Sequence, residues 1–193
     1  RLLACDWGST NLRAWVLDAG GAILAHRSFP LGVQKLEPGE AARRFADEVR
    51  PALEAQDLPA LLCGAVGSNI GWITVPYVDC PADLTQVADG LVQADDKVWI
   101  APGLRCDGLD GACDVLRGEE TLALGWLAAD PARAKGRWLI CQPGTHGKWL
   151  VAEDGRITRF LSAFTGELYA VLSAHSILRS SGQGRDLAVF DEG

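Results

Sequence analysis

Two short turns rich in glycine and hydroxyl groups are the segments of this sequence best suited to chemistry. One follows Asp6, and the other begins 136 positions after the start of the first. Consecutive backbone N–H groups in such turns form a concave set of donors for phosphate oxygens, and glycine lets the backbone approach the ligand closely. We expect phosphate contacts from Gly8, Ser9, Thr10 and Asn11 in the first turn and from Gly144, Thr145 and His146 in the second.

One carboxylate and two cations flank these turns. A carboxylate that ends a buried strand beside a phosphate site can hold Mg²⁺ through its water shell, and Asp6 has that place in the sequence. Its alternative role is that of an aspartate that caps the turn. Arg13 and Lys148 each follow a turn closely. They would either contact phosphate oxygens or be exposed strand residues, and the sequence leaves both roles open.

Neither turn is specific when it is taken alone. The P-loop string G-x-x-x-x-G-K-[ST] does not occur in the sequence, and a single Gly-Ser-Thr turn usually joins the strands of an ordinary hairpin. The recurrence of the turn, with Asp6 before the first copy, favours phosphate binding instead. Two such turns facing each other across a cleft would hold a nucleoside triphosphate from both sides.

The elements that must position these turns follow a pattern that occurs twice. Apolar runs separated by glycine-rich turns predict antiparallel meanders over 2–5, 12–18 and 22–29 and over 137–141, 148–152 and 156–161. Further strands are expected at 61–66 and 97–101, with a glycine-rich loop at 67–72. Helices are predicted from 38 to Pro51, over 81–91 and 118–129, and over 165–178 with Thr165 as N-cap. We interpret the chain as one lobe, 1–133, and the beginning of a related second lobe, 134–193.

Composition and charge restrict the class of protein. The chain has 193 residues, of which 48% are apolar, so it can bury a core. Its six cysteines contain no C-x-x-C pair, and we expect a reduced, cytoplasmic protein without structural zinc. The formal charge of −7 argues against nucleic acid as a partner, and no apolar stretch is long enough for a membrane span. Because methionine is missing and the last residues end no recognisable element, we expect a longer natural protein.

Five motifs occur in order along the chain. They are DWGSTNLRAW (6–15), GAVGSNIGW (64–72), RGEET (117–121), PGTHGKW (143–149) and TGEL (165–168). Together they resemble the 2-dehydro-3-deoxygalactonokinase family of sugar-acid kinases. The resemblance implies an α/β fold of the two-lobed actin/hexokinase type, with an RNase-H-like mixed sheet and flanking helices in each lobe and the second lobe incomplete. It also implies phosphorylation of 2-dehydro-3-deoxy-D-galactonate at O6 with ATP and Mg²⁺, and adenosine contacts from residues beyond those present.

A sugar-acid kinase needs donors for the substrate carboxylate and a group that accepts the hydroxyl proton. We assign Arg117 to the carboxylate and either Glu119 or Glu120 to the proton, with Glu167 as a weaker rival. Acidic residues at a helix start are also favoured by the helix dipole, which explains at least one of them without a catalytic role. Candidates for the sugar hydroxyls and for a wall of the site are Ser68, Asn69 and Trp72.

Other functions on the same scaffold stay open. A non-catalytic sensor of sugars or nucleotides could dispense with Asp6 and with an acid near Arg117, and this chain has both. An RNase-H-type nuclease needs clustered carboxylates and two metals, and the acidic balance without a basic groove counts against it. A kinase for another small acid, 2-keto-3-deoxygluconate or pantothenate, is the nearest alternative. The expected partners are a small sugar acid and ATP, and a homodimer is left open.

Overall fold

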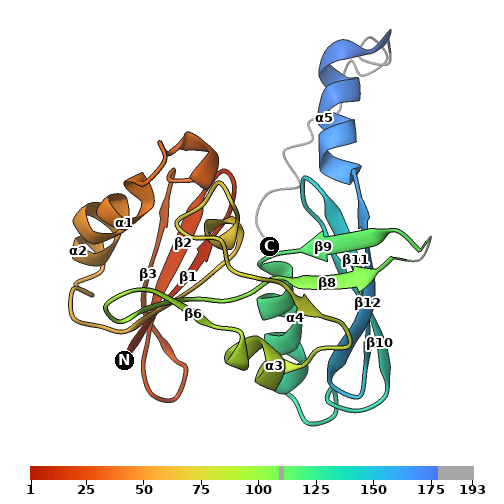
Figure 1. Ribbon diagram of the computed structural model, residues 1–193, viewed down its shortest axis with the longest axis horizontal. Coiled ribbons are helices and arrows are strands. Elements are labelled where there is room, and N and C mark those ends of the chain that lie inside the picture. The colour runs from red at the N-terminus through yellow and green to blue at the C-terminus, as the bar shows by residue number, and fades with distance from the viewer. Residues whose placement is uncertain (109–110, 178–193) are drawn as a thin grey trace.

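The computed structural model describes residues 1–108 and 111–177. Its first part is a mixed sheet with the strand order β3-β2-β1-β4-β7-β6 (Figure 1). β1, β2 and β3 are antiparallel neighbours, β4 and β7 run parallel to β1, and β6 is antiparallel to β7. The carboxyl ends of β1, β4 and β7 therefore meet at one edge of the sheet. The strands are β1 (Leu2–Trp7), β2 (Leu12–Leu17), β3 (Ile23–Phe29), β4 (Ala60–Cys63), β6 (Val92–Asp95) and β7 (Val98–Ile100).

A helical segment covers one face of this sheet (Figure 1). It consists of α1 (Glu40–Arg44), a π-helical turn (Phe45–Val49) and α2 (Arg50–Ala52), so the predicted end near Pro51 is confirmed. Alternation along β1 buries Leu3, Cys5 and Trp7, as expected for a strand with one face on the core. The Phe45 ring stacks on Trp7 with 6.1 Å between centroids, which joins the helical segment to the strand before the first turn.

The second part contains two three-stranded sheets and two helices, α3 (Leu84–Asp89) and α4 (Glu119–Ala128). One sheet has the order β5-β8-β9, and the other is the antiparallel meander β10-β11-β12. A further helix, α5 (Thr165–His175), follows β12 and projects away from the sheets (Figure 1). The strands are β5 (Val78–Asp79), β8 (Leu104–Asp107), β9 (Cys113–Leu116), β10 (Arg137–Gln142), β11 (Gly147–Glu153) and β12 (Arg156–Ala163).

Each part is built around its own buried apolar cluster. In the second part, Leu124 and Leu127 of α4 belong to the same cluster as Leu150 of β11 and Phe160 of β12. Among the described residues, α4 therefore shares its core with the second meander. The lobe boundary near residue 133 stays a prediction.

The predicted strands and helices are present, but three of their boundaries are wrong. The helix expected over 81–91 is limited to α3, because the Asp83 side chain caps it by accepting from the N–H groups of Thr85 and Gln86. The strand expected over 61–66 ends at Cys63, since Gly64 has a φ of 96° that breaks the strand. Thr165 is the first residue of α5 rather than its N-cap. The expected end of that helix at residue 178 lies outside the described residues.

The strand order, with an antiparallel meander followed by parallel strands, is that of an RNase-H-like lobe. A second antiparallel meander repeats the first one along the chain. The expected α/β architecture of the actin/hexokinase type is therefore confirmed. No helix among residues 1–108 and 111–177 is long and apolar enough to cross a membrane.

Candidate active site

Both glycine-rich turns line one cleft of about 390 Å³. The first turn joins β1 to β2, the second joins β10 to β11, and α4 begins between them. The structure thus brings together side chains and turns that lie more than a hundred residues apart in the sequence. The predicted residues that line this cleft are Asp6, Gly8, Ser9, Thr10, Arg13, Arg117, Glu119, Gly144, Thr145, His146 and Lys148.

The carbonyl groups of the first turn are hydrogen-bonded to the loop formed by residues 32–34. Those of Gly8, Ser9 and Thr10 accept hydrogen bonds of 3.1, 3.2 and 3.1 Å from the N–H groups of residues 33, 34 and 32. The N–H groups of Ser9, Thr10 and Asn11 have no hydrogen-bond partner among the described residues. Because the carbonyl oxygens are occupied, the turn can present its donors to an anion.

The second turn is held in the same way by a different element. The carbonyls of Gly144 and Thr145 accept from the N–H groups of Gly166 and Glu167 in α5, at 3.2 and 3.0 Å. The Thr165 hydroxyl accepts from the Gly147 N–H group at 3.1 Å, which explains why this side chain does not cap its own helix. The start of α5 thus braces the second glycine-rich turn in the way that loop 32–34 braces the first glycine-rich turn.

Gly32 is needed because the loop lies directly against the first turn. A Cβ at this position would lie 2.2 Å from the Ser9 carbonyl oxygen and from the Thr10 backbone. We expect Gly32→Ala to lower the free energy of unfolding by about 3 kcal/mol, since the loop or the turn must move. Urea unfolding measures this loss. Gly125→Ala in α4 is the control: its Cβ meets nothing within 4 Å, so it should be neutral or stabilising by about 1 kcal/mol. Equal effects of both substitutions would contradict the bracing role.

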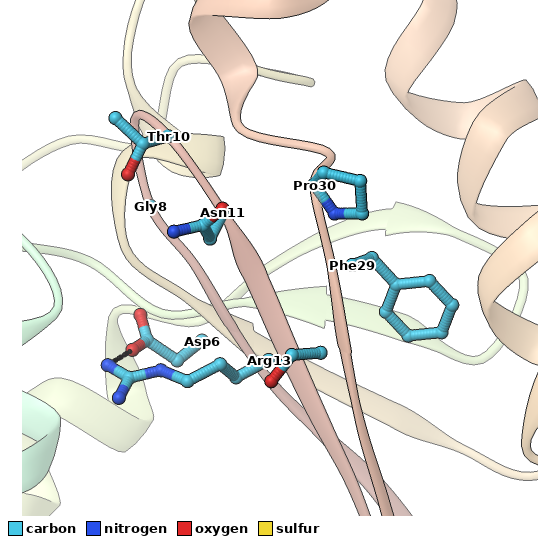
Figure 2. A pocket seen from close by; sticks show the side chains of 8 residues that line it. Asp6, Gly8, Thr10, Asn11, Arg13, Phe29 and Pro30 are labelled. Carbon is cyan, nitrogen blue, oxygen red and sulfur yellow. Dashed lines mark hydrogen bonds and ion pairs between the residues drawn. The ribbon is translucent and has the colours of Figure 1, made fainter. Parts of the chain in front are cut away.

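Asp6 and Arg13 face each other on neighbouring strands (Figure 2). An Arg13 Nη2 atom lies 2.7 Å from Asp6 Oδ2, and the Asp6 side chain is 20% exposed. On the other side of the first turn, the hollow in Figure 2 has a volume of about 570 Å³ and is lined by Asn11, Phe29 and Pro30 as well as Asp6. The Asp6 Oδ1 atom has no hydrogen-bond partner among the described residues. It can therefore accept a hydrogen bond from a water molecule or a ligand.

The chemistry of this donor set fits a hydrated magnesium ion. Among the described residues, no three His, Cys, Asp or Glu side chains gather in a way that would hold a metal ion. Mg²⁺ commonly keeps several waters and takes only one or two carboxylates together with substrate phosphates. A single carboxylate at Asp6 beside the first glycine-rich turn meets that requirement.

The two acids at the start of α4 have different environments. Glu119 lines the cleft, and its Oε2 atom accepts from the Arg117 N–H group at 3.1 Å. Glu120 is fully buried and accepts from the Gly118 N–H group at 2.7 Å and from the Thr121 hydroxyl at 3.0 Å. Burial raises the pKa of Glu120 to about 7. Glu119 can therefore touch a substrate, whereas Glu120 lies beneath the site.

Arg117 lies at the edge of the cleft with an incompletely used guanidinium group. Its Cζ atom lies 4.3 Å from the centre of the Tyr77 ring, and its Nη2 atom donates to the Val75 carbonyl at 2.8 Å. The Nε and Nη1 atoms are buried and have no partner among the described residues. Buried donors without partners are rare in proteins, and they occur where a group has a catalytic role or binds a water molecule or an ion.

Besides Asn11 and the buried Glu120, four predicted residues do not line the cleft. The Ser68 hydroxyl donates to the Ala65 carbonyl at 2.7 Å. Asn69 lines a separate hollow of about 450 Å³, and the Trp72 ring packs on Phe45 with 5.6 Å between centroids. Glu167 contacts the His146 ring at the edge of the second turn. Sugar contacts by these four residues stay predictions.

Gly64 and Gly118 line the cleft but were not predicted from the sequence. Both have positive φ values, of 96° and 110°, and a Cβ on Gly64 would lie 2.7 Å from the Trp7 carbonyl oxygen. Gly64 lies inside the strand predicted over 61–66, and a glycine within a strand pattern was the available signal for a break or a close approach of the backbone. Its absent side chain lets β4 and the start of α4 approach Asp6.

Comparison with known proteins agrees with this arrangement. A family model described as 2-keto-3-deoxy-galactonokinase matches residues 6–193. The chain belongs to the 2-keto-3-deoxy-galactonokinase family. It is 38% identical over 146 residues to the 2-dehydro-3-deoxygalactonokinase of Escherichia coli (strain K12), covering 76% of this chain and 47% of that protein. It is 33% identical over 146 residues to the Rhizobium meliloti (strain 1021) protein named "Probable 2-dehydro-3-deoxygalactonokinase DgoK1", covering 74% and 46%.

Structural comparison supports the same family. A crystal structure of a "putative 2-dehydro-3-deoxygalactonokinase protein from Sinorhizobium meliloti" has a TM-score of 0.82 and 33% identity, covering 96% of this chain and 62% of that one. The chain is therefore similar to this homologue both in its described fold and in its sequence. The chain spans about half the length of the curated relatives it matches.

Proposed function

We propose that the protein transfers the terminal phosphoryl group of ATP to O6 of 2-dehydro-3-deoxy-D-galactonate. The observation that carries this proposal is the pair of turns whose N–H groups are open to one cleft, with Asp6 beside them. The names of the two curated relatives support the substrate and the reaction. A cytoplasmic location and a homodimer stay predictions.

Positioning and neutralisation of charge are the main requirements of phosphoryl transfer. The N–H groups of the two turns would hold phosphate oxygens from opposite sides of the cleft. Mg²⁺ beside Asp6 would supply positive charge against the phosphate oxygens. Glu119 would accept the proton of the attacking hydroxyl, since it lines the cleft whereas Glu120 is fully buried. Arg117, which lines the cleft, would bind the carboxylate of the sugar acid.

A coupled assay of ADP release tests this proposal. The protein is given ATP, Mg²⁺ and either 2-dehydro-3-deoxy-D-galactonate or its gluconate epimer, and NMR of the product identifies the phosphorylated oxygen. We expect release to depend on the sugar acid, to be faster with the galactonate epimer and to give the O6 phosphate. ADP release that is independent of the sugar acid would refute the assignment.

Arg117→Lys should weaken binding of the sugar acid. Lysine cannot reproduce the planar fork that binds a carboxylate through two hydrogen bonds, so KM for the sugar acid should rise roughly tenfold or more. KM for ATP should change little, because Arg117 is not part of either turn. Arg133→Lys is the matched control: this guanidinium also lies over a ring, 4.6 Å from the centre of Trp126, but outside the cleft. An unchanged KM for the sugar acid in Arg117→Lys would exclude Arg117 as the carboxylate ligand.

A further inference from the structure

Lys148 is a charged residue on the core-facing side of β11. Alternation along the strand places it on the same side as Leu150 and Ala152, and all three are buried. Lys148 is only 8% exposed, yet it lines the cleft next to the second turn. A buried ammonium group is costly unless it is hydrogen-bonded and its charge is compensated.

The Lys148 ammonium group is connected to a carboxylate through one hydroxyl group. Its Nζ atom donates to the Ser162 Oγ atom of β12 at 2.6 Å. The Ser162 hydroxyl has a single hydrogen, and it donates this to Asp114 Oδ1 at 2.8 Å. The Ser162 backbone N–H group donates to Asp114 Oδ2 at 2.6 Å, so both carboxylate oxygens are held by the same residue. Asp114 lies on β9, and the chain of hydrogen bonds therefore joins three strands and two sheets.

The Lys148 ammonium group has more N–H donors than this chain of hydrogen bonds uses. Lysine has three N–H donors, and Ser162 is the only hydrogen-bond partner of Lys148 among the described residues. No carboxylate of the described part forms an ion pair with it. The hydroxyl accepts from Lys148 because its own hydrogen is committed to Asp114, which determines the direction of one N–H bond. The other two N–H groups remain available to a ligand in the cleft.

We propose that Ser162 and Asp114 are positioning residues that orient the Lys148 ammonium group to bind a phosphate group in the cleft. The inference deepens the proposed function, because the anion would be the terminal part of the nucleotide. Phosphate rather than the sugar carboxylate is favoured by position. Lys148 lies two residues after the second turn along the chain, whereas Arg117 comes from the segment that precedes α4.

Binding of inorganic tripolyphosphate, measured by isothermal titration calorimetry, tests the network without requiring turnover. Lys148→Met should weaken binding at least tenfold, and Ser162→Ala and Asp114→Asn should each weaken it about three- to tenfold. Ser162→Thr keeps the hydroxyl and should restore affinity to within about twofold of the unsubstituted chain. The double variant Lys148→Met/Ser162→Ala should bind no worse than Lys148→Met, since Ser162 acts through Lys148.

Thr158→Ala is the matched control for the serine substitution. Thr158 is also on β12, but its hydroxyl donates to the Val151 carbonyl at 3.1 Å, outside the cleft. This variant should bind tripolyphosphate normally. Thermal unfolding of every variant separates a loss of folded protein from a loss of affinity.

Each outcome decides the proposal. Normal binding by Ser162→Ala and Asp114→Asn, additive losses in the double variant, or no tripolyphosphate binding by the unsubstituted chain would overturn it. A second titration with 2-dehydro-3-deoxy-D-galactonate should be unaffected by Lys148→Met, and loss of sugar-acid binding alone would assign Lys148 to the carboxylate instead. A protein that binds tripolyphosphate through this network but phosphorylates no sugar acid would refute the proposed function and leave the network in place.

Discussion

Asp6→Asn should lower kcat for sugar-acid phosphorylation by roughly a thousandfold, the scale on which removal of a well-placed electrostatic group acts. The substitution preserves the shape of the side chain but removes the negative charge that would hold Mg²⁺ and its waters beside the first turn. It also removes the charge that pairs with Arg13 at 2.7 Å. Because Arg13 is largely exposed, the unpaired guanidinium should cost little stability. Coupled ADP release at saturating ATP and sugar acid measures the effect.

Asp79→Asn provides the matched control for this loss. Asp79 also pairs with an arginine, through 2.7 and 3.0 Å contacts to Arg105, but it lies on β5 and does not line the cleft. Asp79→Asn should leave kcat within about twofold, because Asp79 lies outside the cleft and an exposed ion pair contributes little to stability. Turnover by Asp6→Asn within tenfold of the unsubstituted protein would remove Asp6 from the catalytic centre. If kcat of Asp6→Asn is low and Mn²⁺ restores it, the result would instead support a role of Asp6 in holding the metal ion.

Glu120→Gln should change how stability depends on pH. Burial raises the pKa of Glu120 from 4.5 to about 7 in the folded protein, so the folded state binds the proton more tightly than the unfolded state. The contribution of this group to the free energy of unfolding is therefore largest below about pH 4.5 and is lost as the pH rises to about 7. The shift corresponds to roughly 3 kcal/mol. Glutamine is uncharged at every pH and can keep hydrogen bonds to Gly118 and Thr121.

Urea unfolding, followed by tryptophan fluorescence without ligands, measures this difference at pH 5 and pH 8. Glu120→Gln should be more stable than the unsubstituted chain at pH 8 by up to roughly 3 kcal/mol, and the two should be much closer at pH 5. Glu119→Gln removes a negative charge from the same helical turn, but Glu119 is not fully buried. This variant therefore separates the effect of burial on stability from the effect of net charge. A difference between Glu120→Gln and the unsubstituted chain that is constant with pH would show that Glu120 ionises normally in the folded protein.

Local patterns in the sequence were sufficient for the framework of the site. The two meanders follow from apolar runs separated by glycine-rich turns, and both turns are where their spacing placed them. Asp6, Arg117 and Lys148 were each identified from a position next to a turn or a helix start, and all three line the cleft. These predictions succeeded because strand alternation and glycine turns depend mainly on neighbours along the chain.

The short strands β5, β6, β8 and β9 were not predicted. Each has four residues or fewer, and a segment of that length has too few alternations to distinguish a strand from a loop. Their pairing depends on partners elsewhere in the chain. Ser162 and Asp114 were missed for the same reason, because nothing near Asp114 in the sequence indicates that β12 lies beside it. Lys148 did carry a local signal, since alternation with Leu150 and Ala152 places it on the core-facing side.

The sequence alone determined where the two glycine-rich turns lie and which residue types surround them. Tertiary structure decided which of these groups meet. Glu119 and Glu120 are adjacent, but successive side chains on a helix point about 100° apart, so packing of α4 against the second meander exposes one to the cleft and buries the other. Packing also occupies carbonyl groups of both turns with hydrogen bonds from loop 32–34 and from the start of α5, whereas the N–H groups of residues 9–11 have no partner in the described part of the chain. Such contacts join segments distant in sequence, and their free energy depends on the whole folded chain.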